Sequence, residues 1–268
     1  MSRLCRLLKV SPAGYYAWQK RGISTHTERD RELTSMIWKI FEGSGGTYGC
    51  PRVHQELRKH GVHVSMRRVS RLMRAGGMRG RVVRVYRARA KQRQMYAAHE
   101  NQVRHQEATR PDAVWVGDVT YLKVARHWCY LAIVMDQCSR RILAWALWLT
   151  RGTQLTRSVF DAAYRARQPD RLIFHSDRGI EYTAPGFRDR LTTLGVRQST
   201  TRGGSPGENA HAESFFHSLK ADVIHGVLFM TDESLRACIR RYVRFYNYKR
   251  LHSSLGYRSP AEFERQAA

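Results

Sequence analysis

Three acidic residues, Asp118, Asp177 and Glu213, are the side chains in this sequence that most strongly suggest catalysis. Asp118 lies inside a run of β-forming residues, Asp177 follows another such run, and Glu213 lies in a helical run, with 35 residues between it and Asp177. Carboxylates that converge from strands and a helix can hold Mg²⁺, which prefers hard oxygen ligands and keeps several waters. Two such ions can activate an oxygen nucleophile and stabilise the leaving oxygen of a phosphodiester. The triad therefore predicts metal-dependent phosphodiester chemistry.

The elements around the two aspartates predict an α/β sheet. Three β-rich runs with short connections favour antiparallel pairing, and a helix, a short buried strand, a second helix and a fifth short strand follow. These elements are expected at 114–124, 128–136, 141–149, 152–167, 172–174, 185–194 and 196–200. This is the order of an RNase H-like core, a five-stranded mixed sheet with flanking helices. Asp118 then falls in the central strand and Asp177 at the carboxyl end of the fourth, where open α/β sheets bind ligands.

Glu213 is expected on a helix with a well-marked start. The segment Ser205–Glu208 fits a capping box with Pro at the first helical position, which gives Glu208 a structural role. His217 and Lys220 follow Glu213 at i+4 and i+7, so the three side chains share one helix face. We expect Lys220 to hold a DNA phosphate beside the metal ions.

Two neighbours of the triad are interpreted as structural. Asp136 ends the second strand run and is a fourth carboxylate, but its place before Ser139 and Arg140 favours a turn residue. Gly179, shortly after Asp177, is expected to permit a tight turn.

The charge of the chain points to a polyanionic partner. The formal net charge is +25 over 268 residues, from 47 Lys and Arg against 22 Asp and Glu. The first 110 residues carry +17 of it, and the stretch from Leu57 to His99 holds 13 basic residues and no acidic ones. Lys and Arg that neutralise phosphates release bound counterions, which favours nucleic-acid binding. The alternative is a ribosomal-type or simply soluble basic surface.

The front of the chain is predicted to be helical, with helices at 3–9, from Pro12, at 28–42, from Pro51 to Gly61, and from Ser65. The last two helices resemble a helix-turn-helix. The second helix would display four arginines to DNA: Arg67, Arg68, Arg71 and Arg74. A helical hairpin with a solvated basic face is the alternative, and the absence of nearby acids in the sequence favours DNA contact.

Composition thus predicts three parts. Residues 1–80 form a helical DNA-binding region, 81–110 a basic linker, and 111–268 an RNase H-like catalytic core with a C-terminal helical extension. The five cysteines never form a CxxC pair, so reduced thiols are expected and a disulfide framework is not. His60 and His63 lack the cysteine pair that would complete a zinc finger. No apolar run reaches the ~20 residues that cross a bilayer, so we expect a cytoplasmic, nucleoid-associated protein and no membrane partner.

Several sequence blocks together resemble a known family. They stand in family order along nearly the whole chain: CRLLKVSPAGYYAW, TYGCPRVHQELRKHGVHVSMRRVSRLMR, VWVGDVTYL, YLAIVMDQCSRRILAWAL, HSDRGIEYT, GENAHAESFFHSLK and YNYKRLHSSLGYRSPAEFE. With these blocks the chain resembles the retroviral-integrase-like transposases of bacterial insertion sequences, specifically the second-frame protein of the insertion sequence three family. Two departures stand out: Glu208 replaces a usual Asp, and Thr200-Thr201 replaces a frequent Met-Ser pair.

The resemblance implies a D,D,E triad, which maps onto Asp118, Asp177 and Glu213. It implies two Mg²⁺ ions, with Mn²⁺ able to substitute, cleavage at the element ends, and attack of the freed 3′-hydroxyl on another phosphodiester. The implied partners are DNA (terminal inverted repeats and target), further copies of this chain, and a first-frame protein as fusion or partner. Basic residues expected to contact DNA in the core are Arg202, His217, Lys220 and Arg250.

Two other functions remain open at this stage. A non-catalytic DNA-binding regulator would need no intact triad. A nuclease on the same fold would cut without joining.

Overall fold

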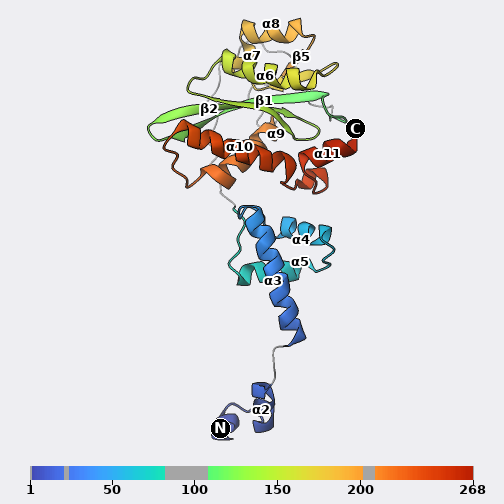
Figure 1. Cartoon of the computed structure of the whole chain (residues 1–268), viewed down its shortest axis with the longest axis vertical. Helices are drawn as coiled ribbons and strands as arrows, with labels where there is room; N and C mark the ends of the chain where they lie inside the picture. The colour runs from blue at the N-terminus through green and yellow to red at the C-terminus, as the bar shows by residue number, and fades with distance from the viewer. Residues whose placement is uncertain (1, 21–23, 82–107, 202–208, 268) are drawn as a thin grey trace. The chain divides into compact units, whose positions relative to one another are not determined.

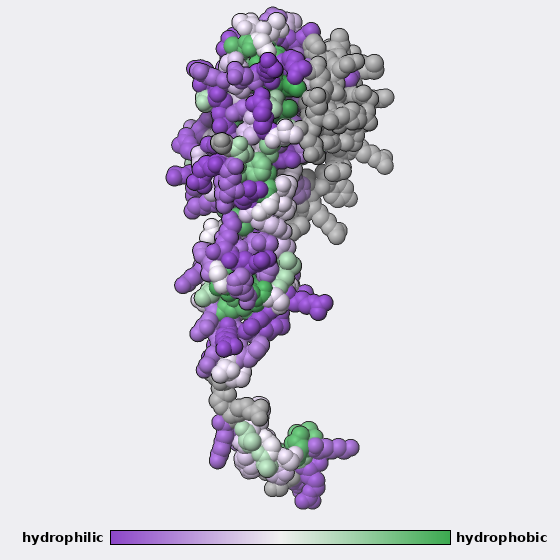
Figure 2. Space-filling model, turned by 90° about the vertical axis from the view of Figure 1, so that its right-hand side faces the viewer, coloured by the Kyte–Doolittle hydropathy of each residue, from purple (hydrophilic) through white to green (hydrophobic). Residues whose placement is uncertain are grey.

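The computed structural model describes residues 2–20, 24–81, 108–201 and 209–267. The chain divides into two compact units, Met1–Arg81 and Val82–Ala268. The predicted linker falls almost entirely outside the described residues. Among the described residues, no helix is long and apolar enough to cross a membrane. Hydrophilic residues cover most of the described surface on the side that Figure 2 shows, in keeping with the strong charge of the chain.

The first unit is entirely helical over its described residues. Its elements are α1 (Ser2–Leu7), α2 (Pro12–Lys20), α3 (Thr25–Gly43), α4 (Cys50–Lys59) and α5 (Met66–Ala75). Two predicted helix starts are confirmed by their caps. The Ser11 hydroxyl accepts a hydrogen bond from the backbone N–H of Gly14 (3.0 Å), and the Ser65 hydroxyl accepts one from that of Arg68 (3.3 Å). The long helix begins earlier than predicted, because Ser24 also caps it through the N–H of Thr27.

Helices α3, α4 and α5 pack around one small core. Apolar side chains at helical spacing face inward, since burial of such a stripe is what stabilises short helices. The buried residues are Leu33, Ile37, Val53, Leu57, Val69, Leu72 and Met73. The helix-turn-helix-like pair α4 and α5 is thus held by α3.

The second unit is built on a five-stranded mixed sheet of order β3-β2-β1-β4-β5. Its strands are β1 (Val114–Val124), β2 (His127–Asp136), β3 (Ile142–Trp148), β4 (Ile173–Ser176) and β5 (Arg197–Thr200). The first three strands pair antiparallel, whereas β4 pairs parallel with β1 and β5 parallel with β4. The predicted fold class is therefore confirmed, with β1 at the centre.

Helices cover both faces of this sheet (Figure 1). One face packs against α6 (Thr153–Arg167), α7 (Ile180–Thr183) and α8 (Pro185–Thr193), around an aromatic group centred on Phe160, Phe174 and Phe187. The other packs against α9 (Ala210–Leu219), its π-helical continuation η1 (Lys220–Ile224) and α10 (Asp232–Tyr248). A 3-10 turn, η2 (Ser253–Leu255), and α11 (Pro260–Ala267) complete the unit. Alternate residues of β1 point to opposite faces, so one strand contributes to both cores.

Asp136 has the structural role that the sequence indicated. It is fully buried, and its carboxylate accepts hydrogen bonds from the backbone N–H groups of Ser139 and Asp112, both at 2.7 Å. Burial raises the pKa of Asp136, and these two hydrogen bonds oppose that rise. The carboxylate thus fixes the turn between β2 and β3.

Candidate active site and DNA-binding surface

The strand register brings Asp118 and Asp177 to neighbouring positions. Strands β1 and β4 pair in parallel up to Gly117 opposite Ser176. The next residue is Asp118 on β1 and Asp177 directly after β4, and neighbouring strands lie about 4.8 Å apart. Both side chains are half-buried. The sheet therefore sets the two aspartates side by side at the carboxyl end of β4.

Gly179 supports Asp177 in a different way from the one predicted. Its φ of −60° is open to any residue, so no glycine-specific turn is present. Its backbone N–H donates to Asp177 Oδ1 at 2.8 Å. A Cβ at this position would lie 2.8 Å from the same oxygen and 2.7 Å from the Glu181 carboxyl carbon. A side chain at this position would therefore have to displace the Asp177 and Glu181 carboxylates.

Asn209 fixes the helix that carries Glu213. Its side-chain N–H donates to the carbonyl of Gly117 at 3.1 Å, directly before Asp118 on β1. Its own carbonyl accepts the backbone N–H of Glu213 at 3.2 Å, so Glu213 lies one helical turn beyond this anchor. The Glu213 side chain is exposed. The described helix begins at Ala210, and the predicted capping box at Ser205–Glu208 lies outside the described residues.

Electrostatics link the acidic residues of this region. Burial is the largest cause that raises the pKa of Asp118, to about 8, and the negative charges of Asp177, Glu213 and Glu181 add to it. A hydrogen bond from the backbone N–H of Val119 opposes the rise. Several carboxylates therefore repel one another around Asp118, an arrangement that a bound cation would relieve.

Sequence reasoning missed the pair Glu181 and Arg151. The Glu181 side chain is buried, and its Oε1 accepts hydrogen bonds from Arg151 Nε (3.1 Å) and Nη2 (2.5 Å). Its Oε2 is buried with no hydrogen-bond partner among the described residues. The Arg151 side chain is 40% exposed, so its cation reaches the surface beside Asp177. Glu181 lies in the block HSDRGIEYT, but nothing in the sequence singled it out or linked it to an arginine 30 residues earlier.

Lys220 faces the site from the helix side. Its ammonium donates to Thr120 Oγ1 at 2.7 Å, and Thr120 lies two residues after Asp118 on the same face of β1. Burial lowers the pKa of Lys220, and the charge of Asp118 opposes that change. Lys220 begins the π-helical turn η1, a local geometry frequent at functional sites. His217, on α9, is exposed.

The donor set of the triad fits magnesium. Asp118, Asp177 and Glu213 supply only carboxylate oxygens, which are the hard ligands that Mg²⁺ takes. The buried Glu181 Oε2 adds an oxygen that accepts no hydrogen bond from a described residue. The carboxylate oxygens of the triad do not all lie within 4.8 Å of one another, so the triad is more open than a closed metal centre. Among the described residues, His127, Cys129 and Asp232 do meet that spacing. An open triad leaves room for the waters that Mg²⁺ retains.

The arginines of α5 do not form the uncompensated row that the sequence suggested. Asp30 of α3 accepts hydrogen bonds from Arg68 (2.7 Å) and Arg71 (2.5 Å). The hydrogen bond from Arg71 is the largest cause that lowers the pKa of Asp30. Arg67 and Arg74 are exposed on the same helix. The argument that no acid compensates this charge was wrong, because Asp30 is 38 residues away in sequence but adjacent in the fold.

Arg250 does not fit the predicted DNA contact. It is only 7% exposed, donates to Ser218 Oγ at 3.2 Å, and lies 3.5 Å from Asp222 and over the ring of Tyr246. Its charge therefore holds the C-terminal end of α10 against η1. Arg202, another predicted DNA contact, lies outside the described residues.

Family models match both units. The HTH-like domain model matches residues 28–86, and two integrase core domain models match residues 108–206 and 194–260. These matches cover the helices around α4 and α5 and the sheet with its carboxylates.

The comparison with solved structures found an integrase catalytic core domain and an intasome. The HTLV-2 integrase catalytic core domain in complex with magnesium is 18% identical, with a TM-score of 0.44, and covers 58% of this chain and 98% of its own. The simian T-cell lymphotropic virus intasome in complex with the PP2A regulatory subunit B56 gamma is 15% identical, with a TM-score of 0.48, and covers 85% of this chain and 74% of its own. At these low scores, the fold assignment rests on the sheet topology and the family models.

Curated relatives match over nearly the full length. Transposase InsF for insertion sequence IS3A of Escherichia coli is 34% identical over 266 residues, which covers 97% of this chain and 92% of the relative. The transposase for insertion sequence element IS904 of Lactococcus lactis is 33% identical over 241 residues, covering 88% of this chain and 95% of the relative. With an integrase core and this identity over almost its whole length, the chain belongs to the IS3 family of insertion-sequence transposases, enzymes of the polynucleotidyl transferase class.

Proposed function

We propose that this transposase cleaves DNA at the ends of its element and joins the freed 3′-hydroxyl to a target phosphodiester, with Asp118, Asp177 and Glu213 as its catalytic carboxylates. The observation that carries the proposal is the register of β1 with β4, which makes Asp118 and Asp177 neighbours. The anchor from Asn209 to Gly117 supports the third place in the triad for Glu213.

The proposed cofactor is a pair of Mg²⁺ ions, with Mn²⁺ as a substitute, held by the same three residues. The all-oxygen donor set and the mutual repulsion of the carboxylates support this choice. When bound, such ions activate the attacking oxygen and neutralise the leaving one.

The protein itself would orient the DNA strand at this site. Lys220 places a cation on the helix side of Asp118, through its hydrogen bond to Thr120. Arg151 places a second cation beside Asp177 and is fixed by the buried Glu181. In the proposal, Lys220 and Arg151 hold the phosphates that flank the scissile bond, and the exposed His217 extends this surface.

The first unit would bind the DNA backbone independently of base sequence and orient the DNA. We propose residues 1–80 as the DNA-binding region, 81–110 as a basic linker and 111–268 as the catalytic core. Arg67 and Arg74 are exposed and are the favoured phosphate contacts on α5, whereas Arg68 and Arg71 pair with Asp30. The proposed partners are the terminal inverted repeats, target DNA, further copies of this chain and a first-frame protein.

The decisive experiment compares Asp177→Asn with Asp189→Asn on labelled element-end DNA. Asn keeps the size of the side chain and can still accept the N–H of Gly179, so folding and DNA binding are expected to persist. Cleavage and joining in Mg²⁺ should be lost in Asp177→Asn and kept in Asp189→Asn, whose carboxylate is exposed on α8. Full strand transfer by Asp177→Asn would refute the triad.

A pre-cut end with a free 3′-hydroxyl separates the alternatives. A transposase joins it to target DNA, a nuclease on this fold only hydrolyses the target, and a DNA-binding regulator does neither.

A further inference from the structure

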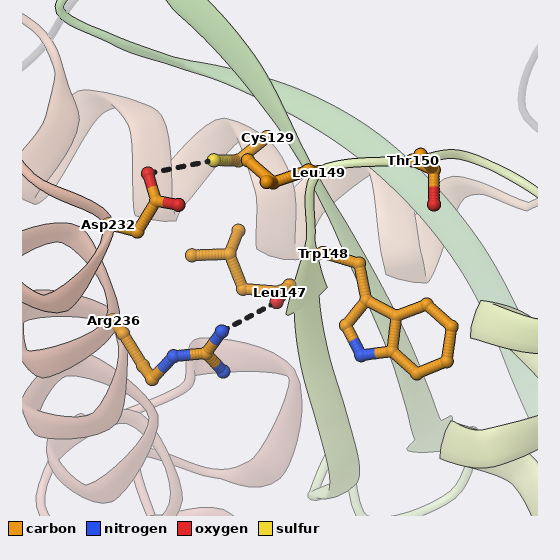
Figure 3. Close-up of a pocket in the computed structure, with 7 residues that line it drawn as sticks. All are labelled: Cys129, Leu147, Trp148, Leu149, Thr150, Asp232 and Arg236. Atoms are coloured by element: carbon orange, nitrogen blue, oxygen red, sulfur yellow. Dashed lines mark hydrogen bonds between the residues drawn. The ribbon is translucent and has the colours of Figure 1, made fainter.

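We propose that His127, Cys129 and Asp232 form a second metal site, distinct from the carboxylate triad, which takes a zinc-type divalent cation. Their ligand atoms all lie within 4.8 Å of one another. Two of them converge on one oxygen: His127 Nε2 lies 2.7 Å from Asp232 Oδ1, and Cys129 Sγ lies 3.5 Å from it. Figure 3 shows the thiol of Cys129 directed at the Asp232 carboxylate.

The β1–β2 hairpin and the start of α10 bring these residues together. His127 and Cys129 are alternate residues at the start of β2, so both side chains point to one face of the sheet. Asp232 is the first residue of α10, which Thr231 caps through the N–H of Ser234. The backbone N–H of Ala125, in the turn before β2, donates to the carbonyl of Phe229 at 2.8 Å. The hairpin and the helix start are thus already joined on each side of the site.

The spacing of the ligand atoms is close to that of a tetrahedral zinc site. Zinc binds sulfur at about 2.3 Å and nitrogen or carboxylate oxygen at about 2.0 Å, so tetrahedral edges are about 3.5 Å for S···O and about 3.3 Å for N···O. The observed S···O distance is 3.5 Å, and the observed N···O distance is 2.7 Å. Opening the His127–Asp232 hydrogen bond by about 0.6 Å would bring the N···O edge to its zinc value; the ligand atoms of His127 and Cys129 lie within 4.8 Å of each other.

Space for a fourth ligand is present. Cys129 and Asp232 line a cavity of about 350 Å³ that Leu147, Trp148 and Arg236 help to enclose (Figure 3). A water molecule needs only about 30 Å³. Arg236 donates to the backbone carbonyl of Leu147 at 2.7 Å, which directs its guanidinium to the backbone and keeps it in place. Three protein ligands and one water is a common zinc arrangement.

The donor types select the metal. Imidazole, thiolate and carboxylate together suit Zn²⁺, whereas Mg²⁺ takes oxygen ligands. Metal binding would release the thiol proton of Cys129 to solvent. The bound ion then balances one thiolate and one carboxylate. Its expected effect is to clamp the β1–β2 hairpin to the start of α10.

The test measures zinc binding by the full chain. Bound metal is first stripped with a chelator, and zinc affinity is then measured by competition with a chromogenic chelator. Excess Mg²⁺ is added to occupy the proposed triad. Repeating the assay in the Asp177→Asn background removes the triad as a source of zinc binding. Wild type and Cys238→Ser should bind one equivalent, because the half-buried thiol of Cys238 also lies on α10 but outside the site. Cys129→Ser, which preserves size and hydrogen bonding, should weaken binding by at least about tenfold.

A second readout identifies the sulfur ligand. Co²⁺ in place of zinc should give a near-ultraviolet thiolate-to-cobalt absorption band that Cys129→Ser lacks. Equal zinc binding by wild type and Cys129→Ser, no zinc retained by wild type, or no thiolate band would each overturn the proposal. The three residues would then be only a His–Asp ion pair beside a buried thiol. None of these results would bear on the triad.

Discussion

Gly179→Ala should disable the proposed active site through a single methyl group. The backbone at this position, with φ of −60° and ψ of 143°, is open to alanine, so strain in the main chain plays no part. The added Cβ would lie 2.8 Å from Asp177 Oδ1 and 2.7 Å from the Glu181 carboxyl carbon. An ordinary contact starts at 3.4 Å, so these groups must move by about 0.6–0.7 Å.

Such a shift has two expected magnitudes. Overpacking typically costs about 1–3 kcal/mol of unfolding free energy, and each kcal/mol lowers the melting temperature of a domain of this size by about 2–4 °C. A misplacement near 1 Å can cost about 10²-fold in rate. We therefore expect cleavage of element-end DNA to fall by one to two orders of magnitude (~10–100-fold), while DNA binding is retained.

The assay pairs Gly179→Ala with Gly186→Ala. Gly186 lies in α8, and outside its chain neighbours and its own helix backbone no described heavy atom lies within 4 Å of the site of its Cβ. Alanine there should stabilise the helix by up to about 1 kcal/mol. Melting temperature and single-turnover cleavage in Mg²⁺ are measured on both variants. If Gly179→Ala melts and cleaves like wild type, the close packing of Asp177 and Glu181 around this glycine is wrong.

Two further predictions concern charge. The slope of log affinity for DNA against log salt concentration should be smaller by about 1 for Arg67→Ala and for Arg74→Ala. Arg71→Ala should change this slope less, because Asp30 already balances Arg71. A larger effect of Arg71→Ala would contradict this account. Burial, and then the charge of Arg140, lower the pKa of His211 to about 4 in the folded chain. The unfolded chain therefore binds the proton more readily, and the free energy of unfolding should fall as pH drops from about 6.5 to 4. Thermal melts of His211→Gln should show a shallower loss over that window, and an unchanged pH profile would rule the effect out.

Much of the fold is determined by local sequence. Ser11 and Ser65 act as helix caps because their hydroxyls reach N–H groups three residues away, a relation that the sequence itself contains. In β1, the central strand, successive side chains point to opposite faces of the sheet. The short connections from β1 to β2 and from β2 to β3 require antiparallel pairing. Asp118 and Asp177 could therefore be assigned to a central strand and a strand end before the structure was known.

Tertiary structure decided how the charged side chains are used, because charge acts through space and not along the chain. Asp30 and Arg68 are 38 residues apart, Arg151 and Glu181 are 30 apart, and Ser218 and Arg250 are 32 apart. No local pattern distinguishes an arginine that pairs with such a distant partner from one that faces DNA. The sequence by itself thus determined the order of elements and the family resemblance, and it is the source of the proposed triad. Only the packed fold decided that Arg250 is buried, that Asp30 neutralises part of α5, and that Gly179 makes room for two carboxylates.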